Sequence, residues 1–147
     1  MTYATFRSSM AGVNDLLCTV NLMSWDARTV MPHGGVASRG LQMATVTGLA
    51  RDIATGDAMA RALDGARAEL MAAGPDDLRH VELAQAEAGI ATLARIPAGL
   101  IREMAELKTT AHAVWVAARQ ANDFATYAPL LTRMLAMERE EIGRAHV

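Results

Sequence analysis

Apolar residues recur at helical spacing along most of the chain, and this periodicity is the feature that most constrains its fold. The clearest stripe consists of Leu100, Met104, Leu107, Ala111, Val114 and Ala118. Residues spaced by three or four positions lie on one face of an α-helix and are buried together. The sequence is dominated by Ala, Leu, Met, Arg and Glu, and it contains no strand pattern of any length. We therefore expect an all-α protein.

Interruptions of this periodicity divide the chain into about six helices with short connections, which predicts an antiparallel helical array. The first helix is expected from about Ser9 to about Asp26, and the second follows the break at Met31–Gly35 and ends at Thr55-Gly56. The third is capped by Asp57 and ends at Gly74-Pro75, and the fourth is capped by Asp76 or Asp77 and reaches about Ala94. The fifth has Pro97 at its first position, and the sixth starts at Pro129. Phe124 to Ala128 is expected to be a turn, and buried positions of the first helix include Met10, Val13, Leu17 and Val20.

Composition excludes several classes of protein. A chain of 147 residues with 52% hydrophobic and 20% charged residues fits one globular domain. The net charge is -2 and no block of Lys or Arg occurs, so neither a nucleic-acid nor a membrane partner is expected. The N-terminus lacks the apolar stretch of a signal peptide, which favours a cytoplasmic protein. The single cysteine, Cys18, lies among apolar residues and is expected to be a buried thiol.

The four histidines do not form a metal-binding motif. They are His33, His80, His112 and His146, and none has another His four positions away. We interpret His33 and His80 as solvent-exposed or hydrogen-bonded side chains. His112 lies one turn before Trp115 and is expected to be buried beside the indole, because a role in proton transfer would need a partner carboxylate that the sequence does not identify.

A Trp-Asp pair at the end of the first predicted helix indicates a fixed corner. Asp26 near a helix C-terminus is unfavourable with the helix dipole unless a cation offsets its charge. Either Arg28 or Arg39 could supply that cation. The indole of Trp25 needs a hydrogen-bond partner if it is buried. These residues define a corner between two helices and do not by themselves indicate a reaction.

Three ordered segments of the chain resemble Taq-type metallocarboxypeptidases. The first is the run Leu22 to Gln42, the second is Ile96-Pro97-Ala98-Gly99-Leu100, and the third extends from Trp115 to Leu130. The signature positions that match are Trp25, Asp26, Met31, Pro32, Gly35, Arg39, Gln42, Trp115, Arg119, Asn122, Asp123, Phe124 and Pro129. Ile96 replaces the usual Leu, and Arg51 stands where a His is common.

The resemblance implies an all-helical zinc peptidase that removes single residues from peptide C-termini with broad specificity. Members are several times longer than this chain and usually homodimeric. Their zinc is held by a His-Glu-x-x-His helix and a downstream Glu, and the Glu of the motif activates the zinc-bound water. Those elements lie beyond the matched region, so no residue here inherits a catalytic or metal role. The chain is expected to bind no zinc, to be inactive alone, and to help form the wall of the substrate cleft.

We interpret residues 1–141 as the N-terminal helical region of such an enzyme. Residues 142–147 match what a sequencing adapter encodes, and we expect them to be an artefact; the alternative is a genuine helix end with Gly143 as terminator. Two other functions stay open. The chain could be a free-standing helical interaction module that buries its Met-rich face on a partner, or a helical bundle that binds a small ligand.

Overall fold

The computed structural model describes residues 2–145, and these form six α-helices, one short 3-10 helix and no strand. The elements are α1 (Tyr3–Thr29), η1 (His33–Gly35), α2 (Val36–Thr55), α3 (Asp57–Leu70), α4 (Arg79–Arg95), α5 (Ala98–Gln120) and α6 (Phe124–Ala145). The prediction of an all-α fold with six helices is confirmed. No helix in the described range is long and apolar enough to cross a membrane.

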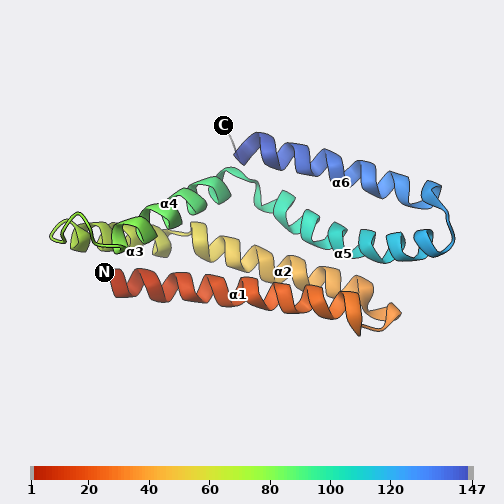
Figure 1. Ribbon diagram of the computed structural model, residues 1–147, viewed down its shortest axis with the longest axis horizontal. Coiled ribbons are helices and arrows are strands. Elements are labelled where there is room, and N and C mark those ends of the chain that lie inside the picture. Colours follow the sequence, from red (N-terminus) through yellow and green to blue (C-terminus); the bar gives the residue numbers. More distant parts are fainter. Residues whose placement is uncertain (1, 146–147) are drawn as a thin grey trace.

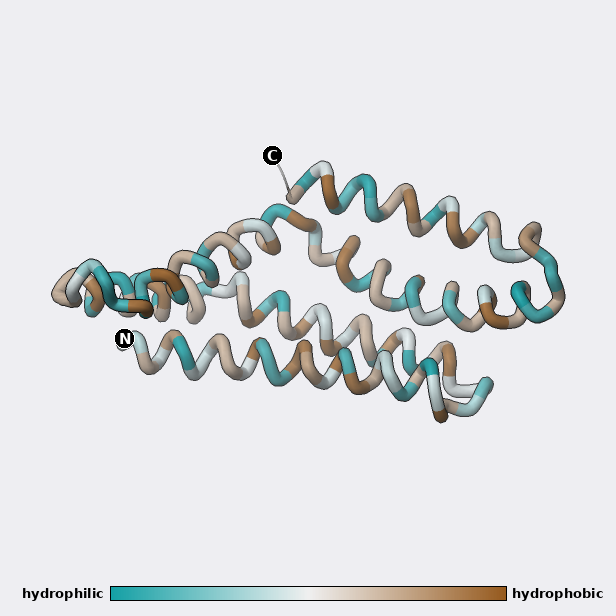
Figure 2. The backbone as a smooth tube through the Cα atoms, viewed as in Figure 1, coloured by the Kyte–Doolittle hydropathy of each residue, from teal (hydrophilic) through white to brown (hydrophobic). Residues whose placement is uncertain are grey.

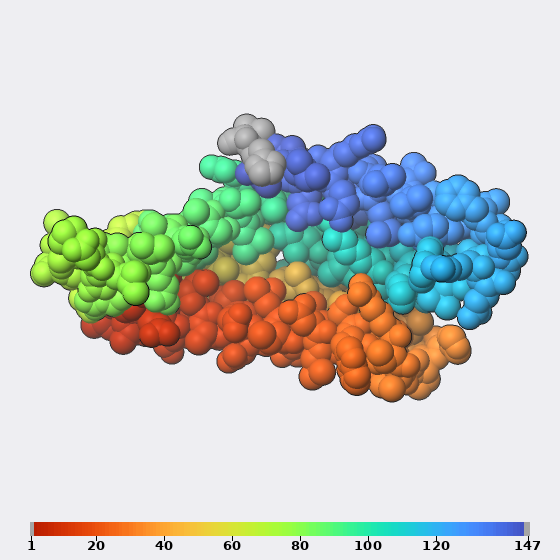
Figure 3. All heavy atoms as spheres, in the orientation of Figure 1, coloured from red at the N-terminus to blue at the C-terminus, as the bar shows by residue number. Residues whose placement is uncertain are grey.

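The helices form two antiparallel pairs joined along one seam. α1 and α2 run side by side in opposite directions, α5 packs on α2, and α6 returns along α5 (Figure 1). α3 and α4 pack together and cover the N-terminal end of α1. The molecule is therefore elongated, with α3 and α4 at one end and the turn between α5 and α6 at the other (Figure 3).

Two separate hydrophobic cores hold these helices together. Apolar and polar residues alternate along each helix, and apolar residues of every helix contribute to one of the two cores (Figure 2). The first core contains residues from α1, α2, α3 and α4, and its most deeply buried large side chains are Phe6, Met59 and Leu70. The second joins α5 to α6 through Leu100, Met104, Leu107 and Met137, with Ile96 at its edge. Burial of each such side chain stabilises the fold by about 1.5–3 kcal/mol.

Small residues let α2 approach α5 closely. Gly40, Ala44 and Gly48 are buried and lie one turn apart on α2. A Cβ added at Gly40 would lie 3.4 Å from the Glu106 carbonyl oxygen, and one added at Gly48 would lie 2.3 Å from Nε of Arg102. A methyl group at Gly40 would therefore be in ordinary contact with α5, whereas one at Gly48 would require the 50% exposed side chain of Arg102 to move aside.

The first helix starts earlier and has a different buried face than predicted. It begins at Tyr3 because Thr2 and Thr5 form a capping box, in which each side chain contacts the backbone of the other residue. Its buried face carries Tyr3, Phe6 and Val13, with Met10 and Leu16 partly buried beside them. Leu17 is 44% exposed and Cys18 is also exposed, so both predictions of burial were wrong.

The last helix also starts earlier than predicted. The segment Phe124 to Ala128 is the first part of α6 and not a turn, and Pro129 lies inside the helix. The Asp123 carboxylate accepts a hydrogen bond from the Thr126 backbone amide at 3.2 Å, which starts the helix there. Gly143 does not terminate α6, which continues to Ala145.

The remaining boundaries differ from the predictions by a few residues. α1 ends at Thr29 instead of about Asp26, and α3 ends at Leu70, before the expected stop at Gly74-Pro75. Gly56, and not Asp57, is the cap residue of α3, and Pro97 is the cap of α5 instead of its first residue. α4 begins at Arg79, whose backbone amide donates to Asp77 at 2.9 Å. His146 and Val147 lie outside the described residues.

Candidate functional site

A cleft of about 310 Å³ lies between the C-terminal end of α1, η1, the start of α2 and the C-terminal half of α5. Its lining includes Arg28 from α1, Met31 before η1, and His112 and Val116 from α5. The cleft therefore brings together two segments that are some eighty residues apart in the sequence, and each of them belongs to a signature segment or adjoins one.

An ion pair fixes the corner between α1 and α2 that forms one wall. Arg39 pairs with Asp26, and its Nη1 also donates to the Met23 carbonyl oxygen at 3.1 Å. Nε of Arg39 donates to Oε1 of Gln42 at 3.2 Å. Of the two cations that the sequence allowed, Arg39 is thus the one that offsets the Asp26 charge. Trp25 is 59% exposed and lies outside the cleft lining.

A glycine in η1 makes room for a methionine of the cleft wall. The backbone turns here through a hydrogen bond from the Gly35 amide to the Pro32 carbonyl at 2.8 Å. A Cβ on Gly35 would lie 3.2 Å from Cγ of Met31, closer than side chains ordinarily pack. The signature residues Met31, Pro32 and Gly35 therefore act together to place one apolar side chain in the cleft.

An aromatic stack stiffens the opposite wall on α5. The ring of His112 stacks on Trp115 with 5.7 Å between centroids, and the Arg119 guanidinium lies 5.2 Å from the Trp115 centroid. His112 packs beside the indole as expected, but it is only half-buried and lines the cleft instead of being buried. Such stacks and cation–π contacts contribute on the order of 0.5–1.5 kcal/mol each. The stack thus orients the imidazole at the cleft surface.

The third signature segment continues into the turn that reverses the chain between α5 and α6. Asn122 has a φ of 54°, in the left-handed region that Asn tolerates better than most residues. Asp123 follows, and hydrogen bonds from the Thr126 hydroxyl and backbone lower the pKa of its carboxyl. Phe124 is 67% exposed and Pro129 is also exposed. These residues shape the turn and do not line the cleft.

The cleft is lined by basic groups without acidic ones. Arg28, His33, Lys108 and His112 belong to its lining, and no Asp or Glu does. Lys108 forms an ion pair with Glu138 of α6 at 2.8 Å. Arg28 makes no hydrogen bond or ion pair within the described part of the chain, and it is exposed. Sequence reasoning considered Arg28 only as a partner for Asp26 and gave no signal for Lys108.

The residues around the cleft do not fit a zinc site. Zinc in peptidases is held by three protein ligands drawn from His, Asp, Glu and Cys. Among residues 2–145 no group of three or more such side chains lies close enough together to hold a metal ion. His33 and His112 line the same cleft without a carboxylate or thiolate between them. We therefore assign no metal ligand and derive no metal-dependent step from these residues.

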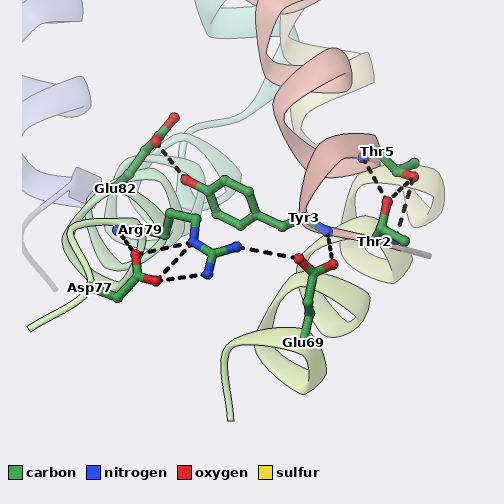
Figure 4. A network of polar contacts seen from close by, with 7 residues as sticks. All are labelled: Thr2, Tyr3, Thr5, Glu69, Asp77, Arg79 and Glu82. Carbon is green, nitrogen blue, oxygen red and sulfur yellow. Dashed lines mark hydrogen bonds and ion pairs between the residues drawn. The ribbon is translucent and has the colours of Figure 1, made fainter. Parts of the chain in front are cut away.

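A second polar network lies far from the cleft and fixes the start of α1 (Figure 4). The Tyr3 hydroxyl donates to Glu82 at 2.5 Å, and the Tyr3 amide donates to Glu69 at 2.9 Å. Arg79 lies over the Tyr3 ring at 5.4 Å and bonds Asp77 at 2.7 Å. Hydrogen bonds from Arg79 lower the pKa of Asp77 to about 2. This network holds α1 against α3 and α4.

Comparison with known proteins gives one family and one related structure. The sequence model of the family described as carboxypeptidase Taq (M32) metallopeptidase matches residues 5–146. A solved structure titled "The Structure of CHT" aligns with a TM-score of 0.64 and 26% sequence identity. The alignment covers 95% of this chain and 28% of that chain, so this chain spans just over a quarter of the length of its structural relative. No curated protein matches it.

Proposed function

Because the chain belongs to the carboxypeptidase Taq (M32) metallopeptidase family, we propose that it is the N-terminal helical part of a zinc-dependent enzyme that removes residues from peptide C-termini. Its specificity for the released residue is broad. The zinc and the groups that activate water belong to the part of the enzyme that the 28% coverage leaves out. The chain alone is then inactive, and the complete enzyme is a homodimer.

One observation carries the role that we assign to this chain. The signature corner at Asp26 and Arg39 and the α5 segment around Trp115 meet at a single cleft, although they are far apart in the sequence. Neither segment contains a group of metal ligands. Met31 is the signature residue that lines the cleft, and the Asp26–Arg39 pair and the Trp115 stack lie on the same two segments as its lining residues. This arrangement supports a role in holding a peptide beside the reacting atoms.

The proposal is tested with the chain continued through the remainder of its reading frame. The purified longer protein is offered a short peptide with a free C-terminus and the same peptide with a C-terminal amide. We expect residues to be released one at a time from the free C-terminus, release to stop when a chelator removes the metal, and zinc to restore it. Cleavage of the amide peptide at the same rate, or release from the N-terminus, would contradict the proposal.

A substitution in the cleft tests whether the cleft contributes peptide binding while the metal site contributes the chemistry. Met31→Ala in the longer protein removes an apolar side chain of the cleft without touching the Arg39–Asp26 pair. We expect a raised KM with a smaller change in kcat, since the cleft contributes binding and not chemistry. Leu135→Ala, at a 51% exposed position on α6 outside the cleft lining, serves as control.

A further inference from the structure

We propose that the cleft between α1 and α5 binds an acidic peptide segment, with a carboxylate side chain at its basic rim and a neighbouring apolar side chain on its floor. The inference rests on the proposed function in one respect, which is that peptides are the class of ligand. It assigns to this cleft the recognition of side chains within a peptide instead of its C-terminal carboxylate.

The charges of the cleft favour an anionic ligand. Arg28 carries a fixed positive charge and has no partner within the described residues, while the histidines His33 and His112 add hydrogen-bond donors. Two acidic groups next to lining residues are already engaged, since Asp26 pairs with Arg39 and Glu138 pairs with Lys108. A guanidinium binds a carboxylate through two parallel hydrogen bonds, which makes Arg28 the group that selects the acidic side chain.

The floor of the cleft favours an apolar side chain beside that carboxylate. Met31, Val36, Met43 and Val116 line it. The volume of about 310 Å³ lies at the lower end of the roughly 300–1,000 Å³ range of ligand pockets, which fits a short stretch of peptide better than a folded domain. Met31 and Met43 are unbranched and polarisable, so they can adapt to different apolar side chains.

The test uses the 147-residue chain and two blocked peptides in isothermal titration calorimetry. The first peptide alternates Leu and Glu, the second replaces every Glu with Gln, and both carry an acetylated N-terminus and an amidated C-terminus. We expect the Glu peptide to bind roughly tenfold more tightly than the Gln peptide, because the Gln peptide lacks the charged partner for Arg28. This preference should shrink as salt is added.

Two variants locate the site. Arg28→Gln should reduce the affinity for the Glu peptide about tenfold and bring it to that of the Gln peptide. Arg61→Gln, at an exposed position of α3 outside the cleft lining, should leave both affinities unchanged. Circular dichroism checks that each variant retains the helical fold, which is expected because Arg28 is exposed and makes no hydrogen bond or ion pair in the described part of the chain.

Equal affinities for the two peptides, or an unchanged affinity in Arg28→Gln, would overturn the inference. An equal loss in Arg61→Gln would do the same, because it would show a general charge effect. Because the peptides carry an amidated C-terminus, their binding tests the cleft at Arg28 and does not depend on the release of C-terminal residues. A longer form that hydrolyses peptides while the blocked Glu peptide fails to bind would leave the peptidase assignment standing and remove the site proposed at Arg28.

Discussion

Arg39 on α2 is bound to the last turns of α1 at two points, the Asp26 carboxylate and the Met23 carbonyl oxygen, the second at a distance of 3.1 Å. The side chains of Arg39 and Asp26 are only 21% and 29% exposed, so solvent screens their attraction less than at a fully open surface. This pair fixes the corner from which the cleft residues Arg28 and Met31 project.

Replacement of Arg39 by Gln should lower the free energy of unfolding by about 1–3 kcal/mol, because the carboxylate of Asp26 loses its partner in a partly buried place. Urea unfolding measures the change. Asp26→Asn is the matched partner in a double-mutant cycle, and the two losses should be less than additive. Additive losses would show that the ion pair does not hold the corner.

Gly56 at the junction of α2 and α3 should not tolerate a side chain. A Cβ there would lie 2.8 Å from the Asp52 carbonyl oxygen, a backbone atom that cannot move aside alone. Gly56→Ala should therefore cost about 1–3 kcal/mol. Gly12→Ala is the control, because no atom lies within 4 Å of its added Cβ and alanine should stabilise α1 by about 0.5–1 kcal/mol. If thermal unfolding showed that both variants change the midpoint temperature in the same direction, this explanation of Gly56 would be contradicted.

Asn122 in the turn between α5 and α6 should be replaceable by Gly but not by Val. Its φ of 54° is strained for a β-branched residue, so Asn122→Val should cost about 1–2 kcal/mol. Asn122→Gly should unfold at nearly the same denaturant concentration as the parent protein. If Val were as well tolerated as Gly, the left-handed turn would not be needed to bring α6 back along α5.

Much of the fold could be predicted from the sequence because apolar spacing reports helices directly. The stripe through Leu100, Met104 and Leu107 is buried as predicted, and it forms the second core. Leu17 was misplaced because Leu16, its neighbour, is the residue that turns toward the core. A stripe of period 3.6 allows either of two adjacent apolar residues, and only packing against α2 and α3 decides between them.

The early start of α6 was missed because Pro129 was weighed as a helix start. The capping side chain of Asp123 and the position of Thr126 three residues later were the local signals for the true start. The sequence predicted that a cation would offset Asp26 but left Arg28 and Arg39 as alternatives, because the choice depends on how α2 packs beside α1. The cleft itself could not be predicted, because its two walls meet only in the folded chain.

Alkaline pH should destabilise the protein through Tyr3. Burial, and then the hydrogen bond to Glu82, raise the pKa of Tyr3 from 10.0 to about 12. Because the folded state holds the proton more tightly than the unfolded state, the stabilisation is complete below pH 10 and is lost as the pH rises towards 12. Tyr3→Phe should abolish this loss, which denaturant unfolding at successive pH values would detect. An identical alkaline decline in the Phe variant would assign the effect to another group.

The central proposal is that this chain binds the peptide while the rest of the enzyme holds the zinc and releases the C-terminal residue. The most direct measurement is the zinc content and C-terminal residue release of the 147-residue chain beside those of the chain continued through its reading frame. We predict that the short chain, after dialysis against zinc, holds no stoichiometric metal and releases no residues, while the continued chain does both. One tightly held zinc per short chain, lost on substitution of His33 or His112, would contradict the account.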